Sequence, residues 1–293
     1  MRVLILGSEG FVGHNLVRGL KNSHEIFTAD QLEQGHEKNY SKLNIINYEN
    51  VEKIVKDVDV VINLVAHTLV SSLSDFTLNA QVNIIGLLNV LEACRKNNVK
   101  KIIFTSASSI VGEPLTFKVS ENHLVTPKTA YGITKMASEH YLRLYNEMYG
   151  LEYVVFRFFN IYGPYQKNGL IPSLYSRIIK EEPVAIFGKG DQIRDYVYIE
   201  DVIPFFEKSI SSKVANNSIL NMGTGNGSTI MDVLNHLSKI INVKPKIDFR
   251  SPRLGEIGNF VADTNLLNST FGMTPNTSIE EGLKKTTTWL KSN

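Results

Sequence analysis

The stretch Val3-Leu4-Ile5-Leu6-Gly7-Ser8-Glu9-Gly10-Phe11-Val12-Gly13 stands at the beginning of the chain and decides the expected fold. Its apolar first part is typical of a strand that is buried on both faces of a parallel sheet. The rest is a G-x-x-G-x-x-G loop that leads into a helix expected to reach about Leu20. Such glycines let the backbone approach a pyrophosphate, which the amides of the helix N-terminus can bind. The stretch predicts a dinucleotide site; the alternative is a plain glycine-rich connection.

A second strand is expected from Glu25 to Ala29 and ends on Asp30. An acidic residue about 20 positions beyond the glycine loop can accept both ribose hydroxyls of NAD and repels the 2′-phosphate of NADP. Asp30 therefore favours NAD over NADP, with an aspartate in a solvated loop as the alternative. Residues 31–42 are polar and are expected to form a loop.

Apolar segments continue to alternate with helical patterns over residues 1–160, which predicts an α/β fold with a doubly wound parallel sheet. The further expected strands and helices are the strand and exit at 59–67, the helix 75–97, the strand 101–105, the helix 129–149 and the strand 151–158. His67 is expected to be a hydrogen-bonded wall residue rather than a catalytic base. Asn83 is either a surface residue of its helix or a brace for the neighbouring strand end.

Tyr131 and Lys135 are four residues apart, so they share one face of the expected helix. If that face borders a redox cofactor, the ammonium group would lower the pKa of the phenol, which could then act as a general base or acid near neutral pH. The spacing alone also fits a solvated surface pair. Ser106 and Ser108 follow a strand, where α/β proteins place substrate contacts, although serines are also ordinary turn residues.

The composition of the 293 residues is that of an ordinary globular protein, with 43% hydrophobic and 20% charged residues and a net charge of +2. The sequence contains no basic block, so a nucleic-acid partner is not expected. No apolar run reaches about 18 residues and no signal-peptide layout is present, so we expect a cytoplasmic protein without a membrane partner. Cys94 is the single cysteine, and its apolar helical surroundings indicate buried packing.

These residues together resemble the extended short-chain dehydrogenase/reductases, the group of NAD-dependent nucleotide-sugar epimerases, dehydratases and reductases. The resemblance extends over nearly the whole chain and includes the segments 157–164, 187–202 and 253–256. It implies a Rossmann-type sheet followed by a smaller C-terminal α/β domain. The implied NAD-binding domain covers residues 1–160, with about 193–222 returning to it, and the nucleotide-sugar-binding domain covers 161–192 and 223–293.

The resemblance also implies a set of site residues. Tyr131 and Lys135 would be catalytic, with Ser108 or Ser106 orienting the sugar. The residues implied to contact NAD are Gly7, Gly10, Phe11, Val12, Gly13, Asp30, Asn44, Ile45, Leu64, Val65, Ala66, Tyr131 and Lys135. Those implied to contact a nucleotide-diphosphate sugar are Asn160, Arg194, Arg253 and Glu256. Guanidinium groups suit diphosphate oxygens, while a surface salt bridge is the alternative for each arginine. No metal site is expected.

Three positions differ from the family pattern. Ala107 stands where the family usually has a Ser or Thr, so Ser106 or Ser108 would supply the hydroxyl. Val111 replaces a common tyrosine, and Asn44 replaces an aspartate that often touches the adenine.

The residues after Ala107 narrow the expected reaction. A 4,6-dehydratase of this family has an Asp-Glu pair there, whereas this chain has Ser108 and Ser109, which disfavours a dehydratase. We expect 4-epimerisation of a nucleotide-diphosphate sugar through a keto-sugar intermediate, with a keto-sugar reductase as the alternative. Asp30 favours NAD and hence the epimerase. A catalytically silent NAD-binding or sugar-nucleotide-binding protein is an alternative from another class, supported by Ala107 alone. The family commonly dimerises through a four-helix bundle, which implies a homodimer through the helices near 75–97 and 129–149.

Overall fold

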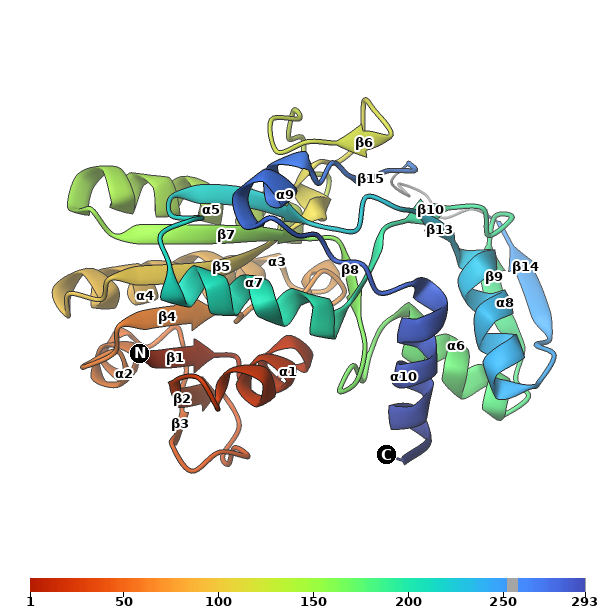
Figure 1. Ribbon diagram of the computed structural model, residues 1–293, viewed down its shortest axis with the longest axis horizontal. Helices are drawn as coiled ribbons and strands as arrows, with labels where there is room; N and C mark the ends of the chain where they lie inside the picture. The colour runs from red at the N-terminus through yellow and green to blue at the C-terminus, as the bar shows by residue number, and fades with distance from the viewer. Residues whose placement is uncertain (252–257, 293) are drawn as a thin grey trace.

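The computed structural model describes residues 1–251 and 258–292, and its centre is a seven-stranded parallel sheet (Figure 1). The strand order is β12-β7-β5-β4-β1-β2-β3. The strands are β1 (Arg2–Leu6), β2 (Glu25–Asp30), β3 (Tyr40–Lys42), β4 (Val60–Asn63), β5 (Lys101–Ala107), β7 (Glu152–Phe158) and β12 (Ser218–Met222). Each neighbouring pair is parallel, so the predicted doubly wound sheet is confirmed.

Helices cover both faces of this sheet, which is why the central strands are apolar on both sides (Figure 1). One face packs against α1 (Phe11–Leu20), α7 (Ile199–Ser211) and α9 (Asn265–Phe271). The other packs against α2 (Tyr48–Ile54), α4 (Gly86–Lys96) and α5 (Ala130–Tyr149). Cys94 is fully buried in the second core, as predicted, and burial raises the pKa of its thiol.

The helix predicted over 75–97 is divided into three parts. It consists of α3 (Phe76–Ala80), a π-helical turn η2 (Gln81–Ile85) and α4. A π turn inserts an extra residue into the helix and changes which side chains face inward. Asn83 lies in this turn and is 4% exposed, so the inward bracing position is the one that the structure adopts.

The polar segment 31–42 is not only a loop. Its last residues form β3, which pairs in parallel with Thr28–Asp30 of β2 at the edge of the sheet. The Tyr40 hydroxyl donates to the carbonyl of Asp30 at 3.0 Å. The prediction of a loop throughout was wrong because an edge strand with one exposed side needs no apolar run.

A smaller α/β part lies beyond one end of the sheet (right in Figure 1). Its helices are α6 (Leu170–Ile179), α8 (Ile230–Ile241) and α10 (Ile279–Ser292), and β9 (Val184–Phe187) pairs with β14 (Ile247–Arg250). The apolar faces of the three helices share one core. The remaining short elements are η1 (Ser71–Leu73), η3 (Ser108–Ile110), and the pairs β8 (Asn160–Tyr162) with β11 (Tyr196–Tyr198), β10 (Ile193–Arg194) with β13 (Ser228–Thr229), and β6 (Lys118–Val119) with β15 (Val261–Ala262).

The chain returns from the smaller part to the large sheet. Helix α7 covers one face of the sheet, and β12 pairs with β7. Phe260, Leu267 and Phe271 are also buried in that core. The boundaries between 1–160 with about 193–222 and 161–192 with 223–293 remain a proposal. Residues 260–271 of the second proposed domain pack on the large sheet. In the ranges that the structure describes, no helix has both the length and the apolar character needed to cross a membrane.

Asp195 links three segments where the two parts meet. Its carboxylate is fully buried and accepts hydrogen bonds from Thr224 N (2.9 Å), Thr224 Oγ1 (2.7 Å), Gly225 N (2.9 Å) and Ala262 N (3.1 Å). Its main-chain carbonyl accepts from Asn160 N at 2.9 Å. Because Asp195 directly follows Arg194, these bonds also position that arginine.

We predict that Asp195→Asn lowers the free energy of unfolding by about 2–4 kcal/mol, because the new amide NH₂ would face backbone N–H groups that lose their acceptor. Urea unfolding followed by circular dichroism measures this change. Asp232→Asn is the matched control, because Asp232 forms the capping box of α8 in an exposed position. Its expected cost is about 1 kcal/mol or less. An equal or smaller cost for Asp195→Asn would contradict this role.

Candidate active site

A cavity of about 1330 Å³ opens where the carboxyl ends of the sheet strands face the smaller part. Residues of both parts line it, and the described members of the predicted site all lie on its wall. They are Gly7, Gly10, Phe11, Val12, Gly13, Asp30, Asn44, Ile45, Leu64, Val65, Ala66, Ser106, Ser108, Tyr131, Lys135, Asn160 and Arg194. The predicted substrate residues Arg253 and Glu256 lie outside the described residues.

The glycine loop has a backbone that only glycine accommodates easily. Gly7 has a φ of +83°, a conformation that other residues rarely adopt. A Cβ on Gly13 would lie 2.2 Å from the carbonyl oxygen of Gly7. Helix α1 starts at Phe11, directly after Gly10, which provides no side-chain cap. The loop thus brings uncapped amides of a helix N-terminus to the cavity wall, which fits the pyrophosphate of a dinucleotide.

Two carboxylates lie at this end of the cavity. Asp30 accepts hydrogen bonds from Gln31 N at 2.7 Å and from Glu9 N at 3.1 Å. Burial raises the pKa of Asp30, and these two backbone bonds oppose that rise. Glu9 also lines the cavity, although the sequence reasoning did not select it. The sequence feature that could have indicated Glu9 is its position as an acidic residue inside the glycine loop. The two acidic groups suit hydroxyl donors such as a ribose and disfavour a phosphate.

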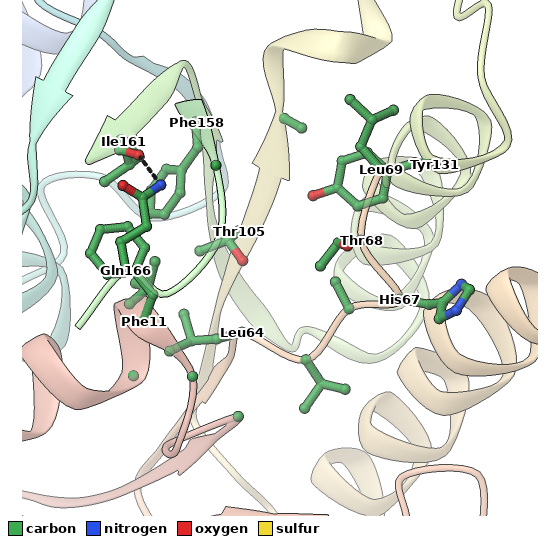
Figure 2. Close-up of a pocket in the computed structure, with 18 of the residues that line it drawn as sticks. Phe11, Leu64, His67, Thr68, Leu69, Thr105, Tyr131, Phe158, Ile161 and Gln166 are labelled. Atoms are coloured by element: carbon green, nitrogen blue, oxygen red, sulfur yellow. Dashed lines mark hydrogen bonds between the residues drawn. The ribbon is translucent and has the colours of Figure 1, made fainter. Parts of the chain in front are cut away.

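Tyr131 and Lys135 lie in the first turns of α5, which Thr129 caps by accepting from Gly132 N at 3.0 Å. Figure 2 shows the Tyr131 ring entering the cavity with its hydroxyl towards the open centre. Lys135 is buried, donates to the carbonyl of Thr105 at 2.7 Å, and lies 5.6 Å from the centre of the Tyr131 ring. The two side chains therefore share one wall of the cavity, as their spacing predicted.

The pKa values of this pair differ from the sequence expectation. Burial raises the pKa of Tyr131 to about 12. Burial lowers the pKa of Lys135 to about 7, and the Glu139 carboxylate opposes that change. Removal from water disfavours the charged form of each group, so in this structure it outweighs the expected effect of the ammonium on the phenol. Both shifts favour the neutral forms of the two side chains.

The structure distinguishes the two serines proposed to replace the hydroxyl missing at Ala107. Ser106 is 2% exposed, and its hydroxyl donates to Glu139 Oε1 at 2.6 Å. Successive side chains of a strand point to opposite faces, so Ser106 faces α5 while its neighbour Thr105 faces the cavity (Figure 2). Ser108 begins η3 on the cavity wall and is only half-buried. Ser108 is therefore the available serine, and Thr105 is a further hydroxyl that the sequence reasoning missed.

A buried ion pair lies behind this wall. Arg157 on β7 donates to Glu139 on α5 through Nε (3.0 Å) and Nη2 (2.8 Å). The side chain of Arg157 is 6% exposed and that of Glu139 is 5% exposed. Together with Ser106, the pair connects α5 to β5 and β7, one turn of helix after Lys135. The sequence carried no signal for it, because the partners are 18 residues apart on different elements.

The remaining predicted residues hold the walls in place. The imidazole of His67 is turned away from the cavity centre (Figure 2). The side chain of Asn83 accepts from the backbone N–H of His67 at 2.8 Å and donates to its backbone carbonyl at 3.1 Å. His67 lines the cavity as predicted, but its hydrogen bonds to Asn83 are made by the backbone, and the buried imidazole Nδ1 has no partner among the described residues. The Asn160 side chain donates to the carbonyl of Asp195 at 3.2 Å. Arg194 is half-buried on the cavity wall and donates to the carbonyl of Ile193 at 2.8 Å.

Comparisons with known proteins agree with this arrangement. The profile of the NAD dependent epimerase/dehydratase family matches residues 3–223. A putative UDP-glucose 4-epimerase from Methanocaldococcus jannaschii is 32% identical over 305 residues, covering 99% of both chains.

Two solved structures are similar over nearly their whole length. UDP-glucose 4-epimerase from Thermotoga maritima, with UDP-glucose, is 30% identical with a TM-score of 0.93, covering 100% of this chain and 99% of the other. The complex of UDP-glucose 4-epimerase from Thermus thermophilus with NAD is 31% identical with a TM-score of 0.91, covering 99% of both chains. On these grounds the chain belongs to the NAD dependent epimerase/dehydratase family.

Proposed function

We propose that this protein is an NAD-dependent epimerase that inverts C4 of a nucleotide-diphosphate sugar through a keto-sugar intermediate. The observation that carries the proposal is the single continuous cavity. It joins the glycine loop, the Tyr131 and Lys135 pair, and Arg194. At about 1330 Å³ it is larger than the ~300–1,000 Å³ of most small-ligand pockets, so it has room for a cofactor and a second ligand together.

The end of the cavity at the glycine loop would hold NAD. The uncapped N-terminus of α1 would bind the pyrophosphate, and Asp30 would face the adenosine ribose. NAD, when bound, supplies a hydride acceptor and later a hydride donor. The side chains of Leu64, Val65 and Ala66 line the wall between that end and Tyr131.

The proton chemistry would fall to Tyr131. Its oxygen points into the cavity, where the phenolate form would take the proton of a sugar hydroxyl, becoming the phenol, and would return that proton after the sugar has turned. A raised pKa of about 12 means that the phenol needs a nearby positive charge to release its proton. Protonated Lys135, held against the carbonyl of Thr105, would supply that charge. Ser108 and Thr105 would orient the sugar oxygen.

The nucleotide-sugar end would be formed by the smaller part of the structure. Arg194 suits a diphosphate because its guanidinium group can bond two oxygens at once. Asn160 is held by its bonds to Asp195 on the same wall. Arg253 and Glu256, outside the described residues, remain proposed contacts.

Two alternatives would use the same cavity. A keto-sugar reductase needs the same tyrosine and lysine, but it consumes reduced cofactor and must exchange it in every cycle. A silent binding protein needs neither proton transfer nor Tyr131. The next two experiments distinguish these three functions.

We predict that Tyr131→Phe lowers turnover of the accepted nucleotide sugar by about 10²–10⁴-fold, because the proton-carrying hydroxyl is lost. Nucleotide binding, measured by calorimetry, should stay within a few-fold of the wild-type value. Tyr141→Phe is the control, because Tyr141 lies on the same helix but packs into the core of the sheet. Unchanged turnover in Tyr131→Phe would contradict the mechanism.

We predict that the protein purified without added cofactor releases about one equivalent of NAD+ or NADH on denaturation, since an epimerase recycles its cofactor. Chromatography of the supernatant identifies the nucleotide. Gly13→Val is the control and should release none, because its side chain would collide with the carbonyl of Gly7. An empty wild-type protein that binds NADH reversibly would favour the reductase, and released NADP(H) would contradict the role of Asp30.

We also propose a homodimer formed through the adjacent helices α3, α4 and α5. Large apolar side chains remain exposed on these helices and on the π turn between them. They include Leu78 (37%), Ile85 (46%), Leu144 (43%) and Met148 (60%). Leu144 and Met148 are one turn apart on the same face of α5. Exposed apolar residues gathered on neighbouring helices are typical of a subunit interface.

We predict that the wild-type protein elutes as a particle of about twice 32.9 kDa in size exclusion with light scattering. The double variant Ile85→Glu, Leu144→Glu should elute as a monomer, because four charges would be buried at the interface. Val214→Glu is the control, since Val214 is 51% exposed on another surface. A monomeric wild type, or a double variant that stays dimeric, would rule out this interface.

A further inference from the structure

Three potential metal ligands converge beside the glycine loop. Glu9 comes from the loop, His14 from α1, and His36 from the connection between β2 and β3. One ligand atom of each residue lies within 4.8 Å of the other two. In the described part of the chain, no other group of three or more His, Cys, Asp or Glu side chains meets this condition.

Glu9 provides a buried anionic ligand. Its side chain is 4% exposed, and its carboxylate contacts Nδ1 of His36. The other carboxylate oxygen accepts from Ser8 Oγ at 3.2 Å and from the backbone N–H of His36 at 3.4 Å. The backbone N–H of Glu9 is bonded to Asp30, so a second carboxylate lies nearby. A buried carboxylate next to another one is stabilised by a cation.

The two histidines come from different segments and their rings contact each other beside Glu9. The rings of His14 and His36 have centroids 4.4 Å apart and are nearly perpendicular, at 80°. The other face of His14 packs on Tyr165, with centroids 4.4 Å apart. That contact holds the His14 ring on the side of His36. The His36 side chain is 70% exposed, so an ion can reach the cluster from solvent.

Positive groups also surround the cluster. Arg18 and Lys167 are close enough to act on His14 electrostatically. Arg18 is directed at Tyr165: its guanidinium group bonds the Tyr165 hydroxyl and lies 5.5 Å from the centre of that ring. The guanidinium group of Arg18 therefore has its own partner in Tyr165.

We propose that Glu9, His14 and His36 bind one divalent transition-metal ion of the zinc type. Two imidazoles and one carboxylate form a donor set that suits Zn²⁺ and leaves a fourth position for water. Mg²⁺ and Ca²⁺ prefer oxygen ligands and fit the set poorly. The bound ion would tie the 31–39 connection and the start of α1 to the glycine loop, next to Asp30. The proposal does not depend on the proposed reaction.

Titration of the tag-free, EDTA-treated full-length protein with Co²⁺ tests this site. Co²⁺ takes the place of Zn²⁺ and reports a low coordination number by its visible absorption. We expect one Co²⁺ per chain, displaced by Zn²⁺. The variants Glu9→Gln, His14→Ala and His36→Ala should each weaken binding at least about tenfold. His140→Ala, which removes an exposed histidine of α5, should bind as the wild type does.

Circular dichroism and thermal melts of each variant establish that it is folded before it is titrated. Absence of stoichiometric Co²⁺ binding by the wild type overturns the site, and the cluster then serves as an ion pair of Glu9 with His36. A loss of less than tenfold in any one of the three folded variants also overturns the three-ligand assignment. If one of the three variants does not fold, it is replaced by a second substitution at the same position: His14→Asn, His36→Asn or Glu9→Ala.

Discussion

The buried ion pair of Glu139 and Arg157 is the interaction on which the candidate active site depends. It attaches α5 to the sheet through two hydrogen bonds from Arg157, and Ser106 of β5 donates to the same carboxylate. Such a pair contributes little net stability, but removal of one partner leaves an uncompensated buried charge. Helix α5 can therefore take only the position in which Glu139 meets both strands. That position places Tyr131 and Lys135 at the cavity wall.

The part of the cavity wall beside α5, around His67, is held by neutral hydrogen bonds (Figure 2). The carbonyl of His67 accepts from Asn79 at 2.9 Å and from Asn83 at 3.1 Å. Asn83 also donates to Thr134 Oγ1 at 3.0 Å, which connects this wall to α5. The network requires Asn83 to face inward, and the π turn provides that orientation. Turns of this kind are frequent at functional sites, in agreement with the place of this one.

Burial determines the electrostatics of the site more strongly than charge pairing does. Tyr131 and Lys135 share a wall, yet their pKa values move towards the neutral forms because both groups leave water. Glu139 restrains this change for Lys135 alone. Burial therefore favours the neutral phenol and makes Lys135 a less basic amine. A group of this kind is typical of catalytic centres.

The sequence by itself determined the architecture and most of the cavity wall. Apolar runs of strand length, the glycine loop and Asp30 are local signals, because each depends on the backbone or burial of neighbouring residues. The spacing of Tyr131 and Lys135 is local in the same way. Thus the parallel sheet, the glycine loop at the cavity and the shared face of Tyr131 and Lys135 could be predicted without coordinates.

Only the tertiary structure decided which side chains meet across elements. The hydroxyl of Ser106 is engaged by Glu139, 33 residues away on another element, which is why we propose Ser108 instead. The inward turn of Asn83, the edge strand at Tyr40 and the contact of Glu9 with His36 likewise depend on partners brought together by folding. Hydrogen bonds and ion pairs act over a few ångströms in space, and no local periodicity in the chain records that proximity.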